Sequence, residues 1–342
     1  MSARIALSEA SPVAASLVDT FGRIHNNLRI SVTDRCNLRC TYCMPEEVQF
    51  LDRSALLSFE EIEQFVRVIA PMGVNKIRLT GGEPLMRKGL ATLVRMLVAV
   101  PGITDIGMTT NGILLEQHAQ ELYDAGLRRL NVSLDTLDEK HFRELSRRDG
   151  LDRVLAGLEA ARRIGFRPIK LNAVAIRGFI EQDAVPLARY CRERGFEMRF
   201  IEYMPIGADS WEREKVFFAH ELLELLDREI APLSPSLNFD PRAPAMDFDY
   251  ADGSGRVGLI ASVSRPFCAS CNRIRLTADG KLRNCLFALD EVDVKSLLSN
   301  PEFDVEQLQQ VIRDNVASKW EGHEINAATF VKPLRTMHAI GG

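Results

Sequence analysis

Short apolar runs alternate with segments of helical periodicity between residues 28 and 203. Runs rich in β-branched and aliphatic residues predict strands, and the segments between them repeat their apolar residues with the period of amphipathic helices. Regular alternation of this kind is typical of βα units that build a parallel sheet. The sequence therefore predicts an α/β fold with six such units, whose strands cover residues 28–33, 76–80, 105–109, 129–134, 169–176 and 197–202.

The helix expected after the first strand has start and stop signals. Ser58 and Glu61 have the spacing of a capping box, in which each side chain accepts a hydrogen bond from the other residue's backbone N–H. Gly73 follows the last apolar position, and glycine readily adopts the left-handed conformation that closes a helix. Between these signals one face is apolar, with Ile62, Phe65, Val66 and Ile69. Glycines also precede later strands, at Gly126, Gly165 and Gly195.

Six βα units fit either a doubly wound sheet or an incomplete barrel, because one sequence does not reveal the strand order. After about residue 204 the pattern changes to loops rich in Pro, Asp and Ser, followed by short strands with a hairpin turn at Asp279-Gly280. We expect one domain over residues 21–234 and a second region over 235–342. Residues 1–20 lack periodicity and are predicted to be a loose leader.

The composition is that of an ordinary globular protein, with 46% hydrophobic and 26% charged residues among 342. A net charge of −4 argues against a nucleic-acid partner. No apolar run reaches the roughly 18 residues of a membrane span, and the N-terminus lacks a basic segment before an apolar one. We expect a cytoplasmic protein without membrane association; a targeting peptide at the N-terminus is the alternative.

Six of the seven cysteines form two triplets, which in a reducing compartment does not indicate a disulfide framework. Cys36, Cys40 and Cys43 have the spacing C-x3-C-x2-C and directly follow the first predicted strand, where α/β folds place their active sites. A zinc knuckle is an alternative, but structural zinc generally takes four ligands. Three thiolates instead leave one iron of a 4Fe-4S cluster open to a chelating ligand.

The second triplet, spaced C-x2-C-x13-C, consists of Cys268, Cys271 and Cys285. Zinc is again the rival, but a fourth ligand is hard to find because His323 and His338 lie well outside the predicted hairpin. The spacing favours a second cluster with an open iron, which would bind substrate. Cys191, on a predicted helix, has no partner and is interpreted as a small buried hydrophobic residue.

The first triplet, with Tyr42 directly before its third cysteine, resembles the motif of the radical S-adenosylmethionine (SAM) superfamily. Residues 79–84 (LTGGEP) are similar to the superfamily's methionine-binding element. The resemblance implies that the open iron binds SAM and that the reduced cluster splits it to a 5′-deoxyadenosyl radical. It further implies an incomplete (β/α)6 TIM-type barrel, and SAM contacts at the strand ends from Tyr42, Gly82, Thr109, Ser133 and Met204.

The second triplet lies in a string, residues 265–286, that resembles the C-terminal cluster motif of the GTP 3′,8-cyclases of molybdenum-cofactor synthesis. Residues 29–36 (RISVTDRC) and the final Gly341-Gly342 are also similar to that family. The resemblance implies that the C-terminal region carries the second 4Fe-4S cluster and the GTP site and closes the barrel mouth. By position against the family motifs, it implies GTP contacts from Arg29, Arg78, Lys170, Arg273, Ile274 and Arg275.

The same resemblance implies an activity and its partners. The deoxyadenosyl radical would remove the hydrogen from C3′ of GTP, the ribose radical would attack C8, and the second cluster would hold the purine. A flavodoxin or ferredoxin would supply electrons, and cyclic pyranopterin monophosphate synthase would receive the product. Members of the family are often dimeric, so a homodimer is one possible assembly. The alternatives are a peptide-modifying radical enzyme, which would bind no GTP, and a zinc-stabilised binding protein; no acid–base residue is identified.

Overall fold

The computed structural model describes residues 16–207 and 210–341. The strands are β1 (Asn27–Ser31), β2 (Lys76–Thr80), β3 (Asp105–Thr110), β4 (Arg129–Ser133), β5 (Ile169–Ala175), β6 (Glu197–Glu202), β7 (Leu233–Pro235), β8 (Met246–Tyr250), β9 (Arg256–Ile260), β10 (Arg273–Leu276), β11 (Lys281–Arg283) and β12 (Val292–Asp293). The helices are α1 (Phe59–Ile69), α2 (Leu90–Val98), α3 (Leu115–Asp124), α4 (Glu139–Ser146), α5 (Leu151–Ile164), α6 (Ile180–Arg194), α7 (Ala219–Glu229), α8 (Lys295–Leu298), α9 (Val305–Ala317) and α10 (Met337–Ile340).

The strands form one sheet in the order β12-β11-β10-β1-β2-β3-β4-β5-β6-β9-β8-β7. Strands β1 to β6 are the six that the sequence predicts, and they are parallel, each paired with the next along the chain. Strands β10 and β9 extend this parallel array at its two edges, beside β1 and β6. The fold is α/β, as expected. Within the part of the chain described, the two edge strands of the sheet, β12 and β7, are not hydrogen bonded to each other.

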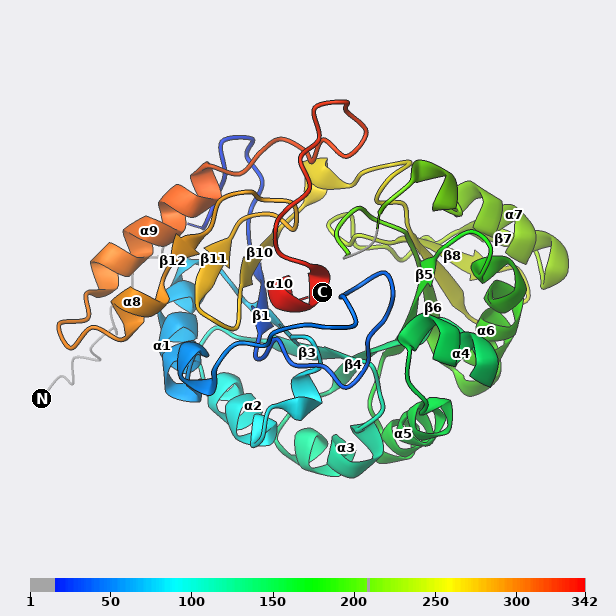
Figure 1. Cartoon of the computed structure of the whole chain (residues 1–342), viewed down its shortest axis with the longest axis horizontal. Helices are drawn as coiled ribbons and strands as arrows, with labels where there is room; N and C mark the ends of the chain where they lie inside the picture. The colour runs from blue at the N-terminus through cyan, green and yellow to red at the C-terminus, as the bar shows by residue number, and fades with distance from the viewer. Residues whose placement is uncertain (1–15, 208–209, 342) are drawn as a thin grey trace, which may run out of the picture.

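The two faces of the sheet differ in polarity. Alternate strand residues such as Leu28, Ile77 and Leu171 are fully buried with helix residues such as Phe65 in one hydrophobic core. Because successive side chains of a strand point to opposite faces, the intervening Arg29, Arg78, Lys170 and Arg199 lie on the other face. Figure 1 shows helices α1 to α6 outside the curved sheet and the C-terminal segment on its inner side. The polar strand positions therefore belong to the concave face.

Helix α1 begins with the predicted capping box. The Ser58 hydroxyl accepts a hydrogen bond from the Glu61 N–H (3.1 Å), and the Glu61 carboxylate accepts one from the Ser58 N–H (2.7 Å). The helix ends at Ile69, and a short 3-10 turn carries the chain to Gly73, whose φ of +99° favours glycine. The buried residues of α1 include all four members of the predicted apolar face.

The C-terminal part of the chain supplies strands to both edges of the sheet, β7 to β9 beyond β6 and β10 to β12 beside β1. The predicted hairpin joins β10 to β11, which pair antiparallel, and Gly280 in its turn has φ +73°. The last residues then return to the concave side, where Gly341 accepts a hydrogen bond from Arg275 through its carbonyl oxygen. Both edges of the parallel array are thus completed by the same region.

Residues 16–20 belong to the predicted leader, and the rest of it, residues 1–15, lies outside the described residues. Leu17 is buried; its N–H donates to the carbonyl of Met72 (3.0 Å), and its carbonyl accepts from the N–H of His25 (2.8 Å). Residues 16–20 are therefore attached to the sheet domain. None of the helices in the described ranges combines the length and the apolar character that a bilayer span requires.

Candidate functional site

The first cysteine triplet lies on the loop that follows β1, at the carboxyl end of the parallel strands. This loop packs against the turn after β2, because the N–H groups of Gly82 and Glu83 donate to the carbonyls of Thr33 (2.8 Å) and Arg35 (2.7 Å). A Cβ on Gly82 would lie 2.5 Å from the carbonyl oxygen of Asp34. Glycine is therefore required at this position by the backbone that leads into Cys36, whatever ligand is bound nearby.

Burial keeps the first three thiols protonated in the absence of a metal. It raises the pKa of Cys36 to about 11, with a further contribution from the charge of Glu83, and the pKa of Cys43 to about 12. The pKa of Cys40 is also raised, by burial and by the charges of Cys43, Asp135 and Cys36. The thiols are thus close enough to influence one another. Coordination by iron would replace these protons, since a thiolate is the form that binds metal.

Glu83 and Asn111 connect the turn after β2 to the first triplet. Glu83 is fully buried; its carboxylate accepts hydrogen bonds from Thr110 (2.7 Å) and from the N–H of Asn111 (2.6 Å), and burial raises its pKa to about 7. The Asn111 side-chain amide in turn donates to Asn37 (2.7 Å) and contacts the sulfur of Cys36 (3.7 Å). The ends of β2 and β3 therefore fix the position of the cysteine loop.

The five predicted SAM contacts all lie at or beyond the carboxyl ends of strands. Tyr42 donates its hydroxyl to Asp135 (2.6 Å), which follows β4, and Asp135 also accepts from the N–H of Val174 in β5 (2.8 Å). Tyr42 and Met204, which follows β6, pack in the same small hydrophobic cluster. Gly82 follows β2, Thr109 is the penultimate residue of β3, and Ser133 is the last residue of β4.

The second triplet lies at the opposite end of the same strands. Cys268 and Cys271 precede β10, which runs parallel to β1, whereas the first triplet follows β1. Cys285 follows β11, which runs antiparallel to β10, so it returns to the end where Cys271 lies. The polar concave face described above thus extends between the two groups of thiols.

Positive charges surround the second triplet. The ammonium of Lys319 lies 3.4 Å from the sulfur of Cys271, and the guanidinium of Arg273 lies 3.5 Å from it. Burial alone would raise the pKa of Cys271, but these two charges lower it to about 6. Burial raises the pKa of Cys268, although that thiol accepts a hydrogen bond from the backbone N–H of His323. The two triplets therefore differ in electrostatic environment.

The two histidines that the sequence places outside the hairpin both approach a cysteine, through their backbone. The N–H of His323 donates to Cys268 and that of His338 donates to Cys43. Across the described parts of the chain, no three His, Cys, Asp or Glu side chains are arranged to hold a single metal ion. A four-iron cluster spreads its thiolates over a larger volume than one ion does, so three thiols at each end are compatible with a cluster.

Three arginines form a row across adjacent strands on the concave face. Arg275 on β10 is the register partner of Arg29 on β1, and Arg29 is the register partner of Arg78 on β2. Burial, followed by the charges of Arg275, Arg273 and Arg78, holds the pKa of Arg29 well below its ordinary value. The pKa of Arg275 is lowered to about 9 and that of Arg78 to about 10, with burial the first cause of each. We refer to these three residues as the arginine row.

The arginine row has few direct partners. Within residues 16–207 and 210–341, the side chain of Arg29 has no hydrogen bond or ion pair, and the negative charge that acts on it is that of Cys271. Arg78 donates to the neutral amide of Asn131 (3.2 Å), and Arg275 donates to the carbonyl of Gly341. Gly107 on β3 makes room for this arrangement, since a Cβ there would lie 2.7 Å from a terminal nitrogen of Arg78. An anion on the concave face would relieve the repulsion among the three charges.

The other residues predicted to contact GTP differ from one another in their surroundings. Lys170 on β5 already forms an ion pair with Glu197. Arg273 reaches Cys271, as described above, whereas Ile274 is fully buried in the main hydrophobic core, so only its backbone can meet a ligand. The sequence reasoning did not single out Arg199 on β6, whose buried Nε lacks a hydrogen-bond partner among the described residues. Arg199 is two residues after Glu197 in the same strand, so strand periodicity places both side chains on the concave face.

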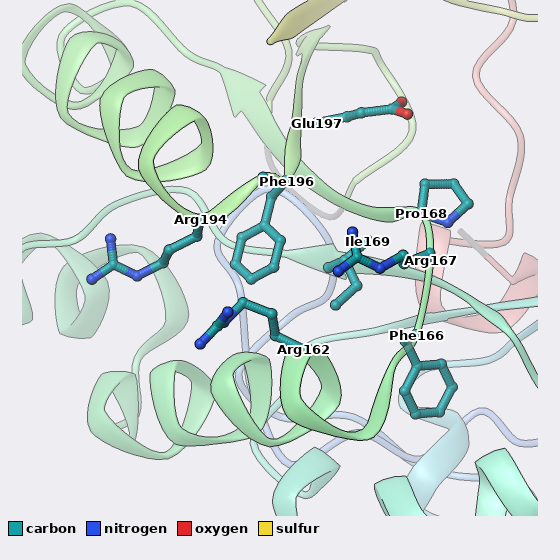
Figure 2. A pocket seen from close by; sticks show the side chains of 9 residues that line it. Arg162, Phe166, Arg167, Pro168, Ile169, Arg194, Phe196 and Glu197 are labelled. Atoms are coloured by element: carbon teal, nitrogen blue, oxygen red, sulfur yellow. The ribbon is translucent and has the colours of Figure 1, made fainter. Parts of the chain in front are cut away.

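A pocket of about 440 Å³ lies at the amino ends of β5 and β6, where α5 leads into β5 and α6 leads into β6. Figure 2 shows Arg162, Arg167 and Arg194 around Phe196 at this pocket. Arg162 is paired with Glu159 (2.7 Å), and Arg194 stacks on the ring of Tyr190 (4.0 Å to its centroid). None of the predicted site residues lines the pocket, and two of its arginines already have partners, so we assign the site to the concave face instead.

Comparison with known families divides the chain into two parts. Residues 30–191 match the Radical SAM superfamily, and residues 196–325 match the family described as Molybdenum Cofactor Synthesis C. The first match contains the first triplet and the second match contains the second triplet. The SAM-bound crystal structure of SuiB from Streptococcus suis has a TM-score of 0.58 at 16% identity, covering 84% of this chain and 68% of SuiB, which supports the fold.

Two relatives of similar length are named GTP 3′,8-cyclase. A GTP 3′,8-cyclase of Rhodopirellula baltica is 49% identical over 336 residues, which is 97% of this chain and 93% of that protein. A GTP 3′,8-cyclase of Mycolicibacterium smegmatis is 45% identical over 342 aligned positions, 97% of this chain and 94% of that protein. Identity of this extent, with both cysteine triplets in place, shows that the chain belongs to the GTP 3′,8-cyclase family of the radical SAM superfamily.

Proposed function

We propose that this chain converts GTP to (8S)-3′,8-cyclo-7,8-dihydroguanosine 5′-triphosphate, the first step of molybdenum-cofactor biosynthesis. The observation that carries the proposal is the arginine row of Arg275, Arg29 and Arg78, which lies on the concave face between the two cysteine triplets. Guanidinium groups bind phosphate bidentately and remain charged, so three neighbouring ones suit a triphosphate. A peptide substrate would not require three positive charges on adjacent strands.

The cofactors are SAM and two 4Fe-4S clusters. Cys36, Cys40 and Cys43 would hold the first cluster, and Cys268, Cys271 and Cys285 the second. When bound and reduced, the first cluster and SAM would supply the radical chemistry that removes a hydrogen atom from C3′ of GTP. The lowered pKa of Cys271 assists metal binding, because Lys319 and Arg273 stabilise the thiolate that a cluster requires.

The residues at the carboxyl ends of the strands would bind SAM. Tyr42, held by Asp135, and Met204 provide an apolar surface next to the first triplet that suits an adenine ring. Gly82 allows the turn after β2 to lie directly against the cysteine loop, and this turn would contact the methionine portion of SAM. Thr109 and Ser133 offer hydroxyl groups at neighbouring strand ends.

The residues of the concave face would bind and orient GTP. The arginine row and Lys170 would hold the triphosphate, with the Lys170–Glu197 ion pair limiting how far that lysine reaches. Arg273 and the backbone of Ile274 would contact the substrate close to the second triplet. Because the two triplets lie at opposite ends of the strands, a nucleotide between them would present its ribose toward SAM and its base toward the second cluster.

We extend this proposal to the architecture. The open sheet would form an incomplete (β/α)6 barrel over residues 21–234, and the C-terminal region, residues 235–342, would close it at the amino-terminal end of the strands. That region would carry the second cluster and part of the GTP site. The contribution of β10 to both the sheet and the arginine row supports this division of roles.

Two partners follow from the reaction: a flavodoxin or ferredoxin would reduce the first cluster, and cyclic pyranopterin monophosphate synthase would take the product. The proposal of a homodimer rests on the family resemblance alone. Seven free cysteines favour a reducing, cytoplasmic environment.

Anaerobic turnover tests the proposal. The holoprotein is incubated with dithionite, SAM and GTP, and the products are identified by mass spectrometry. We expect 5′-deoxyadenosine together with the cyclised nucleotide. The variant Cys268→Ser should lose nucleotide conversion while retaining some reductive cleavage of SAM, whereas conversion at the normal rate would exclude the two-cluster assignment.

A further inference from the structure

Arg23 is a buried residue outside both cysteine triplets and outside the arginine row. Its side chain is locked to Asp19, with Nε 2.5 Å from the carboxylate oxygen Oδ2. Its terminal nitrogens donate to three backbone carbonyls from the other end of the chain, those of Cys268 (2.9 Å), Trp320 (2.6 Å) and Glu321 (2.6 Å). One guanidinium therefore joins three separate segments of the protein.

Asp19 is itself fixed by its own turn. Its Oδ1 accepts hydrogen bonds from the N–H groups of Phe21 (2.9 Å) and Arg23 (3.0 Å), and its Oδ2 also contacts Nε2 of His25 (3.0 Å). The turn is anchored to the sheet domain through Leu17 and Met72. Asp19 thus holds the guanidinium of Arg23 in one orientation, and a bidentate or multiply bonded arginine loses little freedom for each further hydrogen bond.

The three carbonyls belong to the backbone that surrounds the second triplet. Cys268 is one of its thiols, and Trp320 and Glu321 lie between Lys319 and His323, which donate to the sulfurs of Cys271 and Cys268. Gly322 packs directly on Cys268, since a Cβ there would lie 3.6 Å from the Cβ of that cysteine. The region has other ties, since Asn272 bonds Asn26 (2.8 Å) and Lys319 bonds the carbonyl of Arg273 (2.8 Å), but Arg23 bonds both the Cys268 loop and residues 320–321.

We propose that Arg23, oriented by Asp19, is a positioning residue for the second 4Fe-4S cluster. It sets the distance between the Cys268 loop and the 319–323 segment, and through that segment the placement of the Lys319 and His323 donors on the cluster thiolates. Arg23 touches no thiol itself and acts through backbone carbonyls alone. The inference rests on the second cluster of the proposed function and adds a residue that none of the cysteine motifs contains.

Release of iron from the second cluster tests this role. A full-length background with Cys36, Cys40 and Cys43 replaced by alanine retains only the second triplet, and Arg23→Gln and Asp19→Asn are introduced into it. After anaerobic reconstitution, iron loss to a chelator and the electron paramagnetic resonance spectrum of the reduced cluster are recorded. Loss of hydrogen bonds from a charged donor should accelerate iron release roughly tenfold or more and change the spectrum. Arg67→Gln, which breaks an exposed ion pair with Glu63, is the matched control.

Folding is followed by circular dichroism, and SAM cleavage is measured in the variants with all cysteines present. Faster iron release with a folded chain and persisting SAM cleavage supports the inference. Iron release and a spectrum like those of the parent would overturn it. If Arg23→Gln does not fold, Asp19→Asn decides by the same criteria. A parent background that binds no iron at the second triplet would instead contradict the proposed function, so the two failures are distinguishable.

Discussion

Arg29 and Arg275 are register partners on adjacent parallel strands although they come from opposite ends of the chain. Strand β10 inserts beside β1, and this pairing brings the buried Arg275 against the half-buried Arg29. The pKa of each is lowered by burial, and the charge of Arg275 lowers that of Arg29 further. Like charges are placed together at a cost in stability, which is the arrangement expected of a site that binds an anion.

Replacing Arg29 by glutamine should therefore weaken GTP binding without lowering the stability of the protein. The KM for GTP is expected to rise at least about tenfold, because charge-assisted bonds to the triphosphate are lost. The thermal midpoint of the GTP-free protein should stay unchanged or rise, since a repelled charge is removed. Steady-state kinetics and thermal unfolding test the two effects, with Arg67→Gln as an exposed control. A normal KM would argue against a phosphate role for the arginine row.

Two glycines near the site should respond differently to substitution by alanine. At Gly107 the new methyl group would meet the flexible end of Arg78, which can move, so the fold should persist while the KM for GTP rises. At Gly82 it would meet the backbone carbonyls of Asp34 and Arg35, which cannot move without displacing the cysteine loop. Iron content should fall in Gly82→Ala and remain normal in Gly107→Ala. Equal iron contents would contradict the assigned contacts.

His25 predicts a pH dependence of stability. Burial, followed by the charge of Lys319, lowers the pKa of His25 to about 4, and an exposed histidine titrates near 6.5. As the pH falls, His25 therefore takes up a proton in the unfolded chain before it does so in the folded one. Its contribution to the free energy of unfolding is complete above about pH 6.5 and decreases as the pH falls toward 4. At about 1.4 kcal/mol per pKa unit, it amounts to roughly 3 kcal/mol.

The thermal midpoint measured anaerobically between pH 4 and 7.5 checks this effect. His25→Gln should flatten the decline on acidification, although His323 and His338, whose pKa values are also lowered by burial, will leave part of it. His118, which is partly exposed on α3, is the site of the matched control substitution His118→Gln. An unchanged slope in His25→Gln would show that this histidine is not buried in its neutral form.

Cys191 should behave unlike the other six cysteines. It is buried on α6 in the main hydrophobic core, 3.7 Å from the sulfur of Met198, as the sequence predicted for a cysteine without a partner. Cys191→Ala should leave iron and sulfide content unchanged and lower the free energy of unfolding by about 1 kcal/mol. Loss of iron in this variant would require a new account of the cluster ligands.

Local pattern was sufficient to predict the six parallel strands and the capping box of Ser58 and Glu61, because both depend on residues close in sequence. The triplet spacings and the family motif predict six cysteines as cluster ligands, and this assignment stays a prediction. The sequence does not give the orientation of Arg29, Arg78 and Lys170, since periodicity places them on one face of the sheet without saying which face is covered by helices. Only the assembled sheet assigns them to the concave side.

Contacts between distant segments could not be read from the sequence. Lys319 approaches Cys271, and Arg23 reaches Cys268 and residues 320–321, only because the C-terminal region folds back along β1. The backbone approach of His338 to Cys43 has the same origin. In each case the residue has an ordinary local context, so no short motif distinguishes it from a surface position.

The most direct test of the central claim uses GTP that carries deuterium at C3′. The holoprotein is reduced with dithionite in the presence of SAM, and the 5′-deoxyadenosine formed is examined by mass spectrometry. The account predicts one deuterium in the 5′-deoxyadenosine and a cyclised nucleotide that has lost it. Unlabelled 5′-deoxyadenosine formed equally well without GTP would contradict the proposal that this concave face positions C3′ of GTP for the radical.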